Sequence, residues 1–134
     1  MNYYHKLMKA GTMKNLFFAL GSAFSLLSVV FGAFGAHALK DKLSKEMLDI
    51  FEVGVRYQIY HGIGLIVVAW ALSQWQNSLT TAAGWCFIAG ILIFSGSLYI
   101  LSLTNTPWLG AITPIGGLAF IAGWGCLIVA VFRQ

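Results

Sequence analysis

Charged residues are scarce in this chain of 134 residues. Only 9% of the residues are Asp, Glu, Lys or Arg, whereas 59% are hydrophobic. Soluble domains carry roughly 25% charged residues, so the composition excludes a protein whose whole surface faces water. The chain has only two prolines, Pro107 and Pro114. Pro107 prevents a helix from simply continuing through it, and Thr113-Pro114 looks like an N-cap followed by proline at the first helical position.

The chain also has few cysteines and lacks the sequence motifs of common soluble enzymes. Cys86 and Cys126 lie far apart in apolar surroundings without metal-ligand spacing, and we interpret them as small buried hydrophobic residues rather than a disulfide. The sequence has no Gly-rich phosphate loop, no Ser-His-Asp arrangement and no carboxylate pair inside an apolar stretch. These absences argue against a hydrolase or a nucleotide-driven pump. We therefore predict a non-enzymatic protein without a cofactor.

Four stretches of the chain contain no charged residue: Leu16–Ala36, Tyr57–Gln74, Thr81–Leu103 and Pro114–Phe132. Each has about 18 to 23 residues, and roughly 20 apolar residues cross about 30 Å of hydrocarbon. Inside hydrocarbon the backbone must bond within its own segment, so each stretch should be a helix. The sequence predicts an all-α integral membrane protein of the cell membrane, with four transmembrane helices in one multi-pass bundle over residues 14–134. Residues 1–13 are expected to form a weakly structured tail.

The first stretch has a second interpretation as a cleaved secretory signal. Lysines precede it, and Ala36-His37-Ala38 has the small-x-small form of a cleavage site. A signal core has only about 7 to 15 apolar residues, which is shorter than this stretch. Its length therefore favours a helix that stays attached.

Small residues recur in the first stretch at alternating steps of four and three: Gly21, Ser25, Ser28, Gly32 and Gly35. This spacing places them on one face of a helix. Helices in lipid associate where small residues allow close backbone approach. We predict that this face contacts either another helix of the same chain or a second copy in a homo-oligomer.

The segment Leu39–Arg56 contains all four acidic residues and half of the basic ones. Its apolar residues recur at helical spacing and its opposite charges lie four residues apart. Ser44 is a plausible N-cap, and Glu46 would favour the positive end of the helix dipole. We predict a short amphipathic interfacial helix between the first two transmembrane helices; the alternative is a solvated connector.

The net charge of +4 does not indicate nucleic-acid binding, because the basic residues flank the apolar stretches. Lysine and arginine at these positions fit anionic lipid headgroups. The predicted partners are therefore membrane lipids.

If the four helices alternate in direction, one side of the membrane receives most of the unusual residues. His61 is an ionisable group inside a span, and such groups are candidates for function. The predicted ligand-binding site at this end consists of His37, Tyr57, His61, Ser95, Ser97 and Tyr99. It would form a polar pocket, open toward the interface, for a lipid headgroup, a quinone-like ring or a small polar solute, or it would contact a partner.

Three other interpretations of these residues remain open. His37 and His61 can be purely structural and hydrogen-bonded to carbonyl or hydroxyl groups. A small transporter or channel would instead use His61 and the serines of the third helix. A metal-dependent membrane enzyme would combine His37 and His61 with an acid such as Glu52. No helix carries two metal ligands at the usual spacing, so we predict no metal.

Several ordered motifs stand at the ends of the four stretches. They are Gly32-Ala33-Phe34-Gly35-Ala36-His37, Tyr57-Gln58-Ile59-Tyr60-His61, Phe94-Ser95-Gly96-Ser97-Leu98-Tyr99 and Thr113-Pro114-Ile115-Gly116-Gly117 with Gly123-Trp124. From about Met13 to its C-terminus, the chain resembles the small membrane proteins catalogued as domain of unknown function 423. The resemblance implies a four-helix multi-pass protein related to transmembrane protein 256, and it implies no substrate, activity or cofactor. Residues before Met13 depart from the family's usual start.

Overall fold

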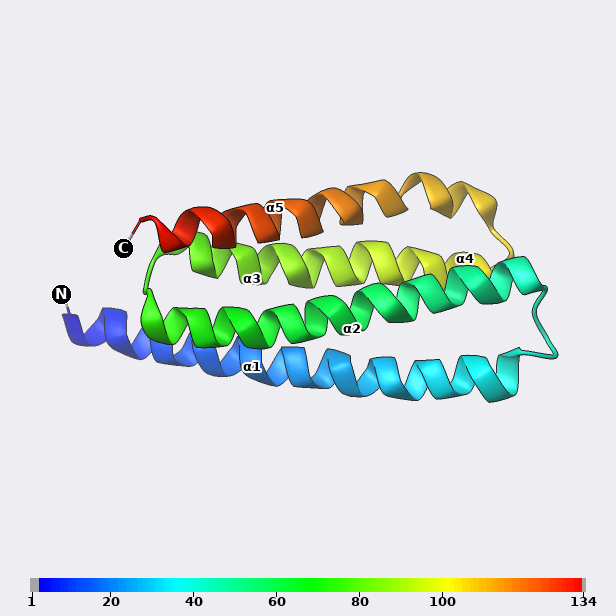
Figure 1. The fold of residues 1–134 in the computed structure, drawn as a ribbon, viewed down its shortest axis with the longest axis horizontal. Helices are drawn as coiled ribbons and strands as arrows, with labels where there is room; N and C mark the ends of the chain where they lie inside the picture. The colour runs from blue at the N-terminus through cyan, green and yellow to red at the C-terminus, as the bar shows by residue number, and fades with distance from the viewer. Residues whose placement is uncertain (1–2, 134) are drawn as a thin grey trace.

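A computed structural model describes residues 3–133 of the protein, and nearly all of them are helical. The elements in chain order are α1 (Tyr3–Phe34), the π-helical turn η1 (Gly35–Leu39), α2 (Lys45–Gln74), α3 (Ser78–Gly90), the π-helical turn η2 (Ile91–Ser95), α4 (Gly96–Thr104), the 3-10 turn η3 (Pro107–Ala111) and α5 (Thr113–Val131). Because α3, η2 and α4 follow one another without a break, they form one long helix (Figure 1).

Four helical segments are long and apolar enough to cross a membrane: Gly11–Leu39, Lys45–Gln74, Ser78–Thr104 and Pro107–Val131. The predicted all-α fold with four transmembrane helices is therefore confirmed. Successive segments run in opposite directions (Figure 1). The connection after η1 and the connection before η3 lie at one end of the bundle, which we call the polar end; the α2–α3 connection and both termini lie at the other.

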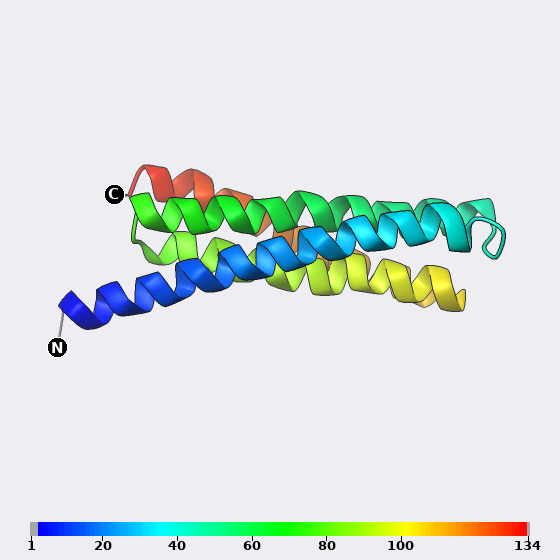
Figure 2. The same ribbon diagram turned by 90° about the horizontal axis from the view of Figure 1, so that it is seen from below.

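The small-residue face of the first helix contacts α2. A Cβ atom added at Gly21 would lie 2.6 Å from the carbonyl oxygen of Gly62, and one added at Gly35 would lie 3.1 Å from the ring of Phe51. The contact face predicted from the spacing is thus used within one chain. From below, α1 runs obliquely across the other helices (Figure 2).

The two helices diverge toward the polar end. At Gly32 the nearest atom to an added Cβ is Val55 Cγ1 at 3.5 Å, compared with backbone contact at Gly21. The main hydrophobic core lies toward the opposite end and includes Phe17, Leu65 and Phe87. Backbone contact between α1 and α2 therefore occurs at Gly21, whereas toward the polar end the side chains of Phe51 and Val55 separate the two helices.

The charged segment does not form a separate interfacial helix, so this part of the prediction is wrong. Ser44 is the N-cap, as expected, because its side chain accepts a hydrogen bond from the backbone N–H of Met47 at 3.2 Å. The helix that starts there continues without interruption to Gln74. No proline breaks the sequence, and adding residues to an existing helix costs far less than nucleating a new one.

The structure also differs from the prediction at residues 3–13, which continue α1 toward the N-terminus rather than forming a weakly structured tail. The same physical reason applies, because a long helix propagates readily into a neighbouring segment that has no proline. Residues 1 and 2 lie outside the described residues.

Candidate functional site

The structure does not bring the two predicted histidines together. His37 is exposed in η1, and Gly35 packs against Phe51. In this antiparallel register, His37 is level with about residue 49 of α2, which is about 18 Å along the helix axis from His61. Among residues 3–133 no three His, Cys, Asp or Glu side chains are grouped so that they could hold a metal ion. In this register His37 and His61 are too far apart to bind one metal ion together, as the metal-enzyme alternative would require.

His61 is buried between α2, α3 and α5, with 5% of its surface exposed. Its Nδ1 lies 2.8 Å from the Tyr57 carbonyl oxygen, and Trp124 Nε1 donates to its Nε2 at 3.1 Å. An indole N–H only donates and a carbonyl only accepts, so the geometry fixes a neutral imidazole with its hydrogen on Nδ1. The ring also stacks on Phe120 with centroids 3.5 Å apart. Both nitrogens of His61 are thus used inside the protein.

A second polar cluster joins α1, α2 and the third span. Tyr99 donates to Gln58 Oε1 at 2.7 Å, and Gln58 Nε2 donates to the carbonyl oxygen of Phe24 at 2.9 Å. Ser95, which is fully buried, donates to the Gly54 carbonyl oxygen at 2.7 Å. A Cβ at Gly54 would lie 2.8 Å from the Tyr99 ring, so glycine allows this close approach. These bonds tie three helices together.

Ser97 belongs to a third cluster, which connects α4 to the start of α5. Its hydroxyl donates to the Phe94 carbonyl oxygen at 3.0 Å and shares a hydrogen bond with Thr113 Oγ1 at 2.7 Å. Thr113 is not the N-cap of α5: that position is Ile112, without a side-chain cap bond, and the Thr113 hydroxyl lies 3.3 Å from the Leu109 carbonyl oxygen. Tyr57 is 39% exposed, and its ring contacts Phe94 at 4.6 Å between centroids.

Four of the six predicted residues thus lie in three internally bonded clusters rather than in one open pocket: His61, Ser95, Ser97 and Tyr99. His37 is exposed and belongs to none of them. Sequence reasoning missed Gln58 and Trp124 as members, although both stand in motifs that were recognised. The spacing of Gly54, Gln58 and His61 by four and three residues was the available signal, because it places them on one face of α2. The partner of His61 on α5 could not be inferred, since it depends on how the helices are rotated.

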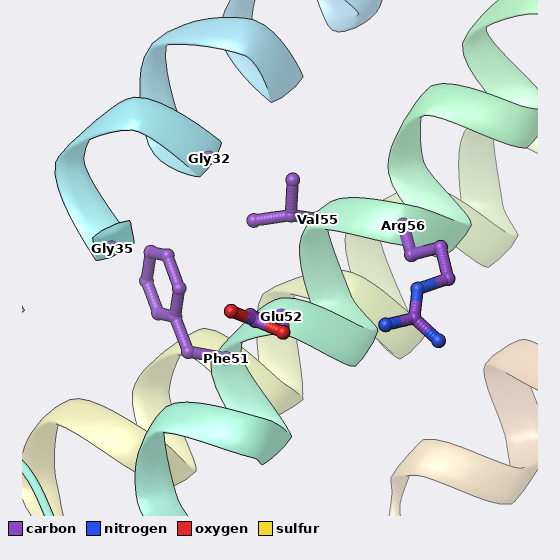
Figure 3. A pocket seen from close by; sticks show the side chains of 6 residues that line it. All are labelled: Gly32, Gly35, Phe51, Glu52, Val55 and Arg56. Atoms are coloured by element: carbon purple, nitrogen blue, oxygen red, sulfur yellow. The ribbon is translucent and has the colours of Figure 1, made fainter. Parts of the chain in front are cut away.

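A groove does open at the polar end, between the end of α1 and the first turns of α2. Its volume is about 290 Å³, and it is lined by Gly32, Gly35, Phe51, Glu52, Val55 and Arg56. Figure 3 shows the two glycines on the α1 side, with the four side chains projecting from α2. We call it the α1–α2 groove; it combines an apolar floor with one acidic and one basic group.

The groove is supported from behind by the second polar cluster. Phe51, which is 3% exposed, contacts the Tyr99 ring with centroids 5.0 Å apart. Tyr99 is fixed by its bond to Gln58, which is anchored in turn to α1. One predicted site residue, Tyr99, therefore helps to hold the groove in shape without lining it.

The charged groups of the groove stand at the edge of the apolar part of α2. Arg56 is the last charged residue before the uncharged stretch 57–74, and Glu52 lies one turn farther out. At 1.5 Å per residue, both fall within about 8 Å of the edge of the hydrocarbon. The headgroup region is about 5 to 8 Å thick on each side, so we expect the groove to open at the level of lipid headgroups.

These features define a small multi-pass α-helical membrane protein with an internally bonded polar end. The family described as Protein of unknown function (DUF423) matches residues 31–117, and the chain belongs to this family. A UPF0382 membrane protein of Staphylococcus haemolyticus is 50% identical over 118 residues, which cover 88% of this chain and 96% of the relative. The UPF0382 membrane protein YwdK of Bacillus subtilis is 47% identical over 119 residues, covering 88% and 97%. No solved structure matches the chain.

Proposed function

We propose that the protein is a non-enzymatic membrane protein that binds a phospholipid in the α1–α2 groove. The observation that carries this proposal is the groove of about 290 Å³ at headgroup level, with apolar and charged walls on the same surface. Gly32, where an added Cβ would meet only Val55 at 3.5 Å, leaves more room than Gly35 for an acyl chain or a glycerol backbone against α1. Glu52 and Arg56 offer polar contacts to the headgroup at the outer edge.

The buried polar residues have a different role in this proposal. Four side chains are hydrogen-bonded to other parts of the bundle: His61, Gln58, Ser95 and Tyr99. Satisfied buried polar networks rigidify a structure. They would therefore keep the divergence of α1 from α2 constant, so that the groove persists when it is empty.

The transport alternative has no comparable support. Three serines of the third span are bonded within the bundle, as is His61: Ser95, Ser97 and Ser102. A path for a solute would have to break these bonds. A lipid in the α1–α2 groove requires no such change.

Co-purification tests the proposal. The protein is extracted in mild detergent and its retained phospholipids are quantified by mass spectrometry, for wild type, Gly32→Leu and Gly125→Leu. Gly32→Leu fills the groove, whereas a Cβ added at Gly125 would meet no atom within 4 Å, so Gly125→Leu provides the matched control. We expect a stoichiometric phospholipid on wild type and the control, and its loss from Gly32→Leu. Equal lipid content in all three proteins would contradict the proposal.

A further inference from the structure

Glu52 and Arg56 carry opposite charges on one face of α2, yet they do not form an ion pair with each other. They are four residues apart, a spacing at which such side chains often pair. Within residues 3–133 neither group takes part in a hydrogen bond or an ion pair. Figure 3 shows the Arg56 guanidinium and the Glu52 carboxylate as two groups that lie apart from each other on α2. Two unpaired opposite charges therefore stand beside one apolar groove.

We infer that the α1–α2 groove selects a phospholipid whose headgroup carries both a phosphate and a primary ammonium group, with Arg56 binding the phosphate and Glu52 the ammonium. This inference rests on the proposed function, because it names the class of lipid that the same groove takes. The inference is based on charge complementarity: the basic and acidic side chains of the groove match the phosphate and the ammonium group of one headgroup.

The chemistry of each group fits its assigned partner. A guanidinium presents paired N–H donors that match the oxygens of a phosphate. A carboxylate accepts hydrogen bonds from an ammonium that still carries N–H groups. Positions four apart on a helix have Cβ atoms about 5 to 6 Å apart, which suits a phosphate and an ammonium joined by a short linker.

The same chemistry disfavours the other common headgroups. A glycerol headgroup offers no positive charge to Glu52, and its phosphate would stand near a second negative group. A choline headgroup has a quaternary ammonium without N–H donors, and such groups are recognised by several aromatic faces. Phe51 is the only aromatic residue among the six that line the groove.

The inference is tested with vesicles that contain phosphatidylethanolamine, phosphatidylglycerol and phosphatidylcholine in equal amounts. Full-length protein is reconstituted, re-extracted, and its retained lipids are measured by mass spectrometry. We expect wild type to retain phosphatidylethanolamine about fivefold over phosphatidylglycerol, because an exposed ion pair contributes at most about 1 kcal/mol. Phosphatidylcholine should likewise be retained less than phosphatidylethanolamine.

Two variants with matched controls assign the roles. Glu52→Gln should abolish the preference while total phospholipid stays unchanged, and Glu46→Gln, outside the groove, should keep the preference. Arg56→Gln should lower total phospholipid, whereas Arg133→Gln should not. All four positions are exposed, so the variants are expected to fold.

The possible failures are distinguishable. Equal retention of the three lipids by wild type, with lipid still lost in Gly32→Leu, would overturn the headgroup assignment and leave phospholipid binding in place. A preference that survives Glu52→Gln would overturn the role of Glu52. If no phospholipid is retained, or if Gly32→Leu retains as much as wild type, phospholipid binding itself fails.

Discussion

At the residue scale, the buried polar side chains toward the polar end of the bundle are hydrogen-bonded to other groups of the protein. His61 uses both ring nitrogens, and Tyr99 uses its hydroxyl on Gln58. An unsatisfied polar group is costly in a membrane interior, so these pairings make the buried polar side chains compatible with the bundle. Among residues 3–133, the exposed charges Glu52 and Arg56 have no such partner, and we therefore propose them as the residues that contact a lipid in the α1–α2 groove.

The tautomer of His61 is the first prediction. Nitrogen-15 NMR of histidine-labelled protein in micelles should show a neutral imidazole protonated at Nδ1. Trp124→Phe removes the donor to Nε2, so it should shift the Nε2 resonance and lower the free energy of unfolding by about 1 kcal/mol. Trp108→Phe is the control, since Trp108 is 65% exposed. A His61 spectrum that Trp124→Phe leaves unchanged would refute this hydrogen bond.

The second prediction concerns the Tyr99 hydroxyl. Tyr99→Phe keeps the ring against Phe51 but leaves the Gln58 amide oxygen without its donor. We expect a loss of about 1 kcal/mol in detergent unfolding experiments. Tyr60→Phe removes a hydroxyl from a ring that is 52% exposed, and it should have little effect. Equal effects of the two substitutions would show that the Gln58–Tyr99 bond does not contribute to stability.

At the scale of elements, close helix contacts depend on a few glycines. A Cβ added at Gly116 would lie 2.7 Å from the Cβ atom of Phe94 and would also press on the backbone of η2. Gly125, in the same helix, has no such neighbour within 4 Å. The two positions therefore separate the packing role of glycine from its effect on helix propensity.

The third prediction follows from this contrast. Gly116→Ala should destabilise the protein by about 1 to 3 kcal/mol, because α5 and η2 must move apart. Gly125→Ala should be neutral or slightly stabilising, since alanine is the better helix former. Thermal unfolding of both variants in the same detergent measures the difference. Matched melting temperatures would contradict the tight α5–η2 contact.

The sequence predicted those elements whose signal is local. The four apolar stretches and the small-residue face of α1 were visible because hydrophobicity and spacing encode them directly. The continuity of α2 was missed, because the charge pattern of residues 45–56 is also typical of a separate interfacial helix. Whether such a helix ends or continues into the next span depends on propagation of the backbone helix. The turn η2 and the pairing of His61 with Trp124 were also out of reach, because they depend on helix rotation and tertiary packing. The α1–α2 groove arises because two helices diverge, and no pattern of residues in the sequence predicts that divergence.

At the scale of the whole molecule, the helices alternate in direction. The connection after η1 and the connection before η3 therefore lie at the same end of the bundle as the charged first turns of α2. The fourth prediction tests this threading. With Cys86 and Cys126 replaced by alanine, single cysteines at Ser44 and Thr106 should react with a membrane-impermeant reagent from the same side of the membrane. A cysteine at Gln76 should react only from the other side. Labelling of positions 44 and 76 from one side would contradict four alternating crossings.

The location of the bound lipid tests the central claim most directly. Protein in nanodiscs is irradiated with a phospholipid that carries a photoreactive group near its headgroup, and the cross-linked peptides are mapped by mass spectrometry. We predict cross-links concentrated on residues 32–35 and 51–56, and their loss in Gly32→Leu. Cross-links concentrated instead around Ser97 and Thr113, or spread evenly over the exposed faces of α1 and α5, would contradict lipid binding in the α1–α2 groove.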